Sequence, residues 1–187
     1  MNISPTEAAD ALRDIAASAD HSRQLKGYEH AAPYFFLWGA IWIIGYGATG
    51  MSPRYGIIWL PLGLVGMAAS FIIGLRQKRS HTIDQRKFGM RMGMTWWVFI
   101  AFYAATLAVL QPHTPNQFGA FPALLMSAIY AGVGIWFLPR WLWLWLGIGI
   151  FTATLVGYFF LAPWFSFWMA AVGGGGLVLS GFWMRKV

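Results

Sequence analysis

The stretch RQKRSHTIDQRKFGMR, from Arg76 to Arg91, decides how the rest of the chain is arranged. It holds six of the thirteen basic residues, and a long apolar run lies on each side of it. Basic residues beside membrane spans stay in the cytoplasm during insertion, so this loop fixes the orientation of its neighbours. We expect its bases to contact anionic lipid headgroups at the cytoplasmic face. These bases are Arg76, Lys78, Arg79, Arg86, Lys87 and Arg91.

The composition is that of a protein that crosses a membrane several times. Of the 187 residues, 58% are hydrophobic and only 10% are charged, whereas a soluble domain carries about 25% charged residues. The net charge of +7 would suggest nucleic acid as the partner of a soluble protein. Here the bases adjoin apolar runs and lack interleaved aromatic residues, so we expect lipid and no nucleic acid. The absence of cysteine excludes disulfides, thiolate metal sites and cysteine nucleophiles.

The apolar runs predict an all-α fold, a bundle of six transmembrane helices arranged as three helical hairpins. Spans are expected at residues 33–50, 56–75, 95–111 and 117–138, and two more within residues 141–184. The last segment has no charged residue, and one helix of this length would be about 66 Å long, twice the hydrocarbon thickness. We therefore expect a turn at Leu161-Ala162-Pro163.

The first thirty residues are predicted to form a separate unit, a cytoplasmic amphipathic helix and a link, ahead of a transmembrane domain at residues 31–187. The helix would begin with Ser4 as N-cap and Pro5 at the first helical position. It would end at residue 27, because Gly27 is a natural C-cap. Its thin apolar stripe indicates that it leans on a partner or on the membrane surface. The stripe consists of Ala8, Leu12, Ile15 and Ala19.

The charge distribution predicts that both termini are cytoplasmic. With this orientation twelve of the thirteen bases lie inside, and only Arg54 lies outside. The opposite orientation would leave one base inside, against the preference of basic loops for the cytoplasm.

The second, fourth and sixth spans carry small residues at spacings of three and four, which place each set on one helix face. Small residues allow helices in lipid to approach closely. We therefore expect these helices to pack centrally and the aromatic-rich first, third and fifth spans to face lipid or a partner. The predicted packing residues are Gly63, Gly66, Ser70 and Gly74, then Ala123, Ser127, Ala131 and Gly134, then Ala170, Gly173, Gly174 and Gly181.

Each pair of spans also has a proline near the start of its second helix and a base at its end. The prolines are Pro61, Pro122 and Pro163, and the bases are Arg76, Arg140 and Arg185. Three such two-helix repeats resemble the small six-span acid-resistance membrane proteins of bacteria (HdeD-type). This resemblance implies that the membrane is the inner membrane of a bacterium. The closest stretch is GIGIFTATLVGYFFLAPWFSFWMAAVGGGGLVLSGFWMRK, from Gly147 to Lys186. The resemblance covers the spans and offers no catalytic residues, and the basic loop and the many tryptophans depart from it.

Candidate catalytic and metal-binding groups do not combine into a site. The spans lack charged residues, which argues against a pump or a proton-coupled exporter. Asp20-His21-Ser22 has the residue types of a hydrolase triad, but neighbours on a helix point about 100° apart. His30 and His81 are expected at one face and His113 about 30 Å away at the other, which excludes a shared haem. We expect no catalytic, cofactor or metal site, with a surface metal bound by His30 and His81 as a minor alternative.

Two further patterns have a structural and a chemical interpretation. Met90, Met92 and Met94 could bind a soft ion such as Cu(I) if the segment were extended, but a flexible apolar lead-in is favoured. The four glycines at residues 173–176 lack the Lys-Ser/Thr of a phosphate loop. Close helix packing is their favoured interpretation, and a local unwinding that lines a cavity is the alternative.

Three functions remain open. The favoured one is a non-catalytic accessory, regulatory or structural subunit of a membrane assembly, with a protein partner or a homo-oligomer. The alternative is a small permease or channel for a neutral or hydrophobic solute, which would need a polar cavity reaching Ser70, Ser127 and Ser166. The third is a membrane enzyme that acts on lipid, for which no convergent groups are found.

Overall fold

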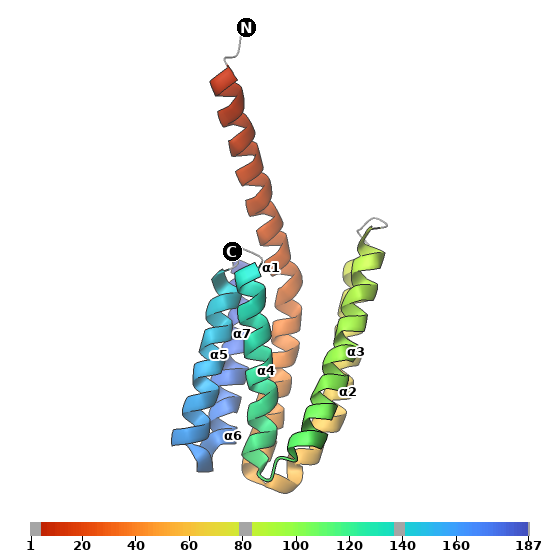
Figure 1. Cartoon of the computed structure of the whole chain (residues 1–187), viewed down its shortest axis with the longest axis vertical. Coiled ribbons are helices and arrows are strands. Elements are labelled where there is room, and N and C mark those ends of the chain that lie inside the picture. Colours follow the sequence, from red (N-terminus) through yellow and green to blue (C-terminus); the bar gives the residue numbers. More distant parts are fainter. Residues whose placement is uncertain (1–4, 79–83, 137–140, 187) are drawn as a thin grey trace.

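The chain folds as a set of helices, and no strand occurs in the part of the chain that the structure describes (Figure 1). The computed structural model describes residues 5–78, 84–136 and 141–186. The elements are α1 (Pro5–Met51), the 3-10 helix η1 (Pro53–Ile58), α2 (Trp59–Lys78), α3 (Asp84–Leu110), α4 (Pro115–Trp136), α5 (Trp141–Phe160), the 3-10 helix η2 (Ala162–Trp164), α6 (Phe165–Trp168), the π-helix η3 (Met169–Gly174) and α7 (Gly175–Lys186).

Among the described residues, five helical segments are long and apolar enough to cross a membrane, which indicates a multi-pass membrane protein by length and composition. They are Gly27–Met51, Pro53–Gln77, Pro115–Trp136, Leu142–Phe160 and Ala162–Lys186. The remaining expected span falls on α3, whose apolar segment within the described side chains, Ile100–Leu110, is shorter than a span. Six spans in three hairpins therefore stay a prediction.

The first helix is continuous, and the predicted stop at Gly27 is wrong. α1 runs through Gly27 and through Pro33 without a break. The residues that follow Gly27 hold the helix together, because Tyr28 and Ala32 are buried in the core. Tyr28 also packs edge-on against Trp183 of α7, with ring centroids 5.9 Å apart. Packing of the next turn thus overrides a local C-cap signal, and neighbouring helices tolerate the proline.

The N-terminal part of α1, residues 5–26, projects beyond the other helices, and we name it the arm (Figure 1). A helix of 47 residues is about 70 Å long, more than twice the hydrocarbon thickness. Within the arm, Leu12 is 67% exposed and Ile15 is 65% exposed. The central two residues of the predicted apolar stripe are therefore uncovered in the single chain.

The first span lies at the centre of the bundle, although the odd-numbered spans were expected to face lipid or a partner. Of the even-numbered spans, the fourth and the sixth reach the core as expected, and the second does not. Large side chains of α1, among them Phe35, Trp42 and Tyr46, are buried in the core together with residues of α4 and of the α6–α7 segment. The second span lies at the edge, because Leu64 and Phe71 of α2 are exposed. The bulky aromatic side chains of α1 fill the space between several helices, which places this helix at the centre.

The turn between α3 and α4, at the far end of the bundle from the arm, is built by local capping (Figure 1). Thr114 is the N-cap of α4: its Oγ1 accepts from the backbone N–H of Gln117 (3.3 Å), and Gln117 Oε1 accepts from that of Thr114 (3.1 Å). Pro115 occupies the first helical position between them. This is a capping box, and it begins the helix two residues before the predicted start of the span at residue 117. Gln111, with φ 43°, closes α3 just before it.

The predicted break between the last two spans is confirmed at the expected residues. α5 ends at Phe160, and the chain resumes as a 3-10 turn at Ala162–Trp164 that contains Pro163. Asn116 Nδ2 donates to the carbonyl of Ala162 over 2.8 Å, which joins this turn to the start of α4. The two connections are therefore held together at one end of the bundle.

Candidate functional site

Aromatic side chains with polar tips join the helices through hydrogen bonds. The pairs are Tyr46 Oη to the carbonyl of Gly119 (2.7 Å), Trp38 Nε1 to Ser70 Oγ (3.2 Å), Trp59 Nε1 to Thr49 Oγ1 (3.1 Å) and Trp168 Nε1 to the carbonyl of Ala153 (2.8 Å). A polar group in hydrocarbon has no water to bond, so each donor needs a partner within the protein. These bonds link α1 to α2, α1 to α4 and α5 to α6, and they occupy polar groups that a solute could otherwise contact.

One aromatic donor is an exception. The indole Nε1 of Trp143 is buried and has no hydrogen-bond acceptor among the described residues. Its ring lies against Phe35, 5.3 Å between centroids, and against Tyr130, at 5.6 Å. Phe35 and Tyr130 are themselves stacked at 5.8 Å. The three rings contact one another directly, so they form a packed cluster and leave no space for a ligand between them.

The small residues of α2 face the aromatic side of α1 over three of the four predicted positions. A Cβ on Gly66 would meet Ile41 at 2.7 Å and Trp38 at 3.0 Å. Ser70 accepts the Trp38 indole hydrogen bond, and a Cβ on Gly74 would lie 3.3 Å from Tyr34 Oη. Gly63, by contrast, faces open space.

The small residues of α4 lie against α5 and the core. Ala123 and Ser127 are buried, and Ser127 Oγ donates to the carbonyl of Leu124 over 2.7 Å. A Cβ on Gly134 would collide with the backbone of Leu144 on α5. Ala131 also contacts α5 closely, because a Cβ added to Gly147 of α5 would lie 2.5 Å from the Ala131 nitrogen.

The small residues of the last span lie along α1. Ala170 is buried beside them. A Cβ on Gly173 would lie 3.1 Å from the ring of Trp42, and one on Gly174 would lie 3.1 Å from the carbonyl oxygen of Gly39. Further along, a Cβ on Gly181 would lie 3.1 Å from the ring of Phe36.

The glycine quartet is split between two environments. Gly173 and Gly174 end the π-helix η3 and face α1, whereas a Cβ on Gly175 or Gly176 would meet nothing within 4 Å. The segment is widened into a π turn and is not unwound. π turns are frequent at functional sites, but here the buried side of this one is filled by Met169 and by α1.

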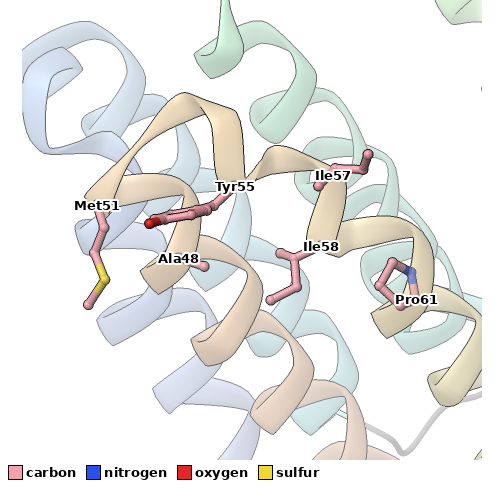
Figure 2. A pocket seen from close by; sticks show the side chains of 6 residues that line it. All are labelled: Ala48, Met51, Tyr55, Ile57, Ile58 and Pro61. Atoms are coloured by element: carbon pink, nitrogen blue, oxygen red, sulfur yellow. The ribbon is translucent and has the colours of Figure 1, made fainter.

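A solute path was expected to follow a polar cavity that reaches Ser70, Ser127 and Ser166. Ser70 and Ser127 are engaged in the hydrogen bonds given above, and Ser166 is half-buried. An open groove of about 630 Å³ lies elsewhere, at the junction of α1, η1 and α2 (Figure 2). Its lining residues are Ala48, Met51, Tyr55, Ile57, Ile58 and Pro61. An apolar groove at one end of two helices is not a route across the bundle.

The predicted lipid-contacting bases lie around the end of α2 and the start of α3. Arg76 is exposed. Lys78 ends α2, whereas Arg86, Lys87 and Arg91 belong to the first turns of α3. Arg79 lies outside the described residues. The loop is thus shorter than the sequence suggested, because helices enter it from both sides.

The histidines and methionines considered as ligands are separated by the fold. His30 is half-buried on α1, where its carbonyl accepts from Gln77 Nε2 over 2.9 Å, while His113 is exposed in the turn before α4. His81 lies outside the described residues. Within residues 5–78, 84–136 and 141–186 no three His, Asp or Glu side chains gather as metal ligands would. The residues from Met90 to Met94 belong to the helix α3, and not to the extended segment that a shared methionine site would need.

Two close contacts were missed because they lie on spans expected to face lipid. Gly39 of α1 meets Gly174, and Gly147 of α5 meets Ser127 and Ala131. The glycines of WGAIW and LGIGI were the available signal, since glycine in an apolar helix marks close approach. The predicted small residues on the even-numbered spans are only one partner in each of these contacts.

No protein-family model, curated protein or solved structure matches this chain. The resemblance to the HdeD-type proteins therefore stays a prediction, and the function has to be argued from the geometry.

Proposed function

We propose that this chain is a non-catalytic integral protein of a bacterial inner membrane that acts as an accessory, regulatory or structural subunit of a membrane assembly. One observation supports the proposal most strongly: the arm is a direct continuation of the central helix α1. A movement or a load applied to the arm is therefore transmitted to the core of the bundle, as a docking element requires.

The base of the arm is held firmly. Tyr28 is 3% exposed and contacts Trp183 of α7. A little over two turns further along, Phe36 contacts Phe182 at 4.8 Å between ring centroids. The Arg185 guanidinium lies 4.8 Å from the centroid of the Phe36 ring. An arm fixed in this way cannot lie down on the membrane surface without breaking the helix.

The free part of the arm offers an apolar contact. Leu12 and Ile15 are three residues apart, so they share one face of the helix, and both are exposed. Covering such a side chain is worth about 1.5–3 kcal/mol. The only described ion pair on the arm, Arg13 to Asp10 at 3.4 Å, is exposed and adds little. A helix of a protein partner or of a second copy is the occupant that fits this face.

In this proposal both termini lie in the cytoplasm, where the arm meets its partner. The charge distribution supports this orientation, because it leaves only Arg54 on the other side. The bases at the end of α2 and the start of α3 then contact anionic headgroups.

A permease or channel for a neutral solute is the second candidate, and it is less well supported. The π turn at Met169–Gly174 favours it, because such turns often accompany function. The engaged hydroxyls of Ser70 and Ser127 count against it, because they remove the polar lining of the expected path.

The test is the mass of the particle, extracted from its native membrane in lipid nanodiscs, with each bound protein identified. The full chain should form one stoichiometric assembly, and Leu12→Asp should weaken it by about 10- to 100-fold in affinity, because the apolar contact of Leu12 is lost. The matched control is Ala17→Asp, which adds the same charge at an exposed position on the opposite side of the arm.

The control variant should keep the assembly. A monomer for the unmodified chain, or an assembly that Leu12→Asp leaves unchanged, would contradict a docking role for the arm. Either result would favour the permease or channel instead.

A further inference from the structure

The groove at the junction of α1, η1 and α2 has an apolar floor and an open side (Figure 2). Its position is set by the two spans that meet there, because the first span ends at Met51 and the second begins at Pro53. The groove therefore lies where the hydrocarbon meets the headgroup region. Tyr55, which is exposed and lines it, has the amphipathic character typical of that depth.

The 3-10 helix η1 shapes the groove and places a charge beside it. Residues three apart share a face in a 3-10 helix, so Tyr55 and Ile58 lie on one face, and Arg54 and Ile57 lie on the next. Tyr55, Ile57 and Ile58 all line the groove. The start of η1 is fixed by Ser52, whose Oγ accepts from the backbone N–H of Arg54 over 3.4 Å. Arg54 therefore belongs to the same short helix that forms the groove wall.

The charge of Arg54 has no acidic counterpart nearby. All six acidic residues lie at or before Glu29 on α1, or at Asp84. Glu29 is separated from Met51 by about 33 Å of helix. Asp84 begins α3, a 27-residue helix about 40 Å long whose other end lies toward η1 (Figure 1). An exposed guanidinium at the headgroup level therefore attracts an anion from outside the chain.

We propose that the groove and Arg54 together bind one anionic phospholipid of the bilayer. An acyl chain occupies the apolar groove, and the phosphate accepts hydrogen bonds from the Arg54 guanidinium, which matches phosphate geometry better than an ammonium does. The occupant is a lipid because the groove is almost wholly apolar and lies where two spans end. The exposed Arg54 lies on the same 3-10 helix that forms the groove wall. This site is independent of the arm and of its partner.

The experiment uses a single cysteine as reporter, since the chain has no cysteine of its own. Gly47 is suited to it, because a Cβ there meets nothing within 4 Å and Met51 lies one turn further on the same helix face. Gly47→Cys is labelled with a bimane fluorophore in nanodiscs of equal parts phosphatidylglycerol and phosphatidylcholine. Only one of the two lipids carries brominated acyl chains, so composition and charge of the bilayer stay constant while the quencher changes.

The expected result is a preference of about fivefold for contact with the anionic lipid, the value of one basic residue near an anionic surface. Arg54→Gln should bring the preference to unity, and Arg54→Lys should keep part of it. The side chain of Arg54 is exposed, so neither change disturbs the fold.

A second reporter provides the matched control. Gly149→Cys on α5 also points into open space but lies away from the groove, and both lipids should quench it equally. Equal quenching at Gly47 in the unmodified background would overturn the proposal, as would a preference for phosphatidylglycerol that survives Arg54→Gln.

Discussion

Gly147→Ala is expected to lower the free energy of unfolding by about 2–3 kcal/mol, although alanine is the better helix former. The added Cβ would lie 2.5 Å from the nitrogen of Ala131 and 2.7 Å from the carbonyl oxygen of Ser127. Both are backbone atoms of α4, so no side chain can rotate away and the helices must separate. This contact joins α4 to α5, so a separation of the helices here weakens their packing along the whole pair.

The control for this variant lies two residues away on the same helix. A Cβ on Gly149 meets nothing within 4 Å, so Gly149→Ala should be neutral or should stabilise the protein by up to about 1 kcal/mol. Equilibrium unfolding of both variants in the same mild detergent makes the comparison. If the two alanines shift the unfolding free energy in the same direction and by the same amount, α4 and α5 do not pack as described.

Gly174→Ala is expected to destabilise the protein by about 2 kcal/mol, because it separates the π-helix from the central helix. The added Cβ would meet the nitrogen of Ile43 at 2.9 Å and the carbonyl oxygen of Gly39 at 3.1 Å. Gly39 and Gly174 thus permit two helix backbones to touch, which is the usual role of small residues in lipid.

Gly176→Ala is the partner control, since it adds the same methyl group on the open side of α7. It should unfold at the same temperature as the unmodified protein or a little higher. Thermal unfolding followed by circular dichroism measures both variants. A Gly174→Ala protein as stable as Gly176→Ala would contradict the crossing of α1 with η3.

Much of the helical architecture could be predicted from local pattern. The break at Leu161-Ala162-Pro163 was predictable because a charge-free segment of that length exceeds the membrane thickness and proline removes a backbone donor. Pro5 was predicted at the first helical position, and α1 begins there. Each of these features depends on residues close together in the sequence.

The features of the fold that were not predicted depend on contacts between residues far apart in the sequence. Gly27 has the local properties of a C-cap, yet the helix continues because Tyr28 reaches Trp183 across the bundle. Similarly, the stripe of small residues on α2 gave no information about how many helices would surround it, and α2 lies at the edge. Such outcomes are set by tertiary packing, which one chain segment does not encode alone.

The groove and the charge of Arg54 beside it could be predicted from the sequence only in part. Arg54 was predicted to lie alone on one side of the membrane, whereas lipid contact was predicted at the opposite face. The 3-10 helix that carries Arg54 spans six residues, and its positions in the groove wall follow a three-residue period, which differs from the period of about 3.6 residues of the predicted spans.

The central claim is that α1 is one rigid helix that links the arm to the core, and a distance between two spin labels tests it most directly. Ala17→Cys and Met51→Cys introduce two labelling sites at exposed positions of the cysteine-free chain. They lie 34 residues apart on α1, which corresponds to about 51 Å along a continuous helix. Pulsed electron paramagnetic resonance in nanodiscs should give one narrow distribution near this distance. A broad distribution centred well below it would mean that the helix breaks near Gly27 and that the arm is not joined rigidly to the core.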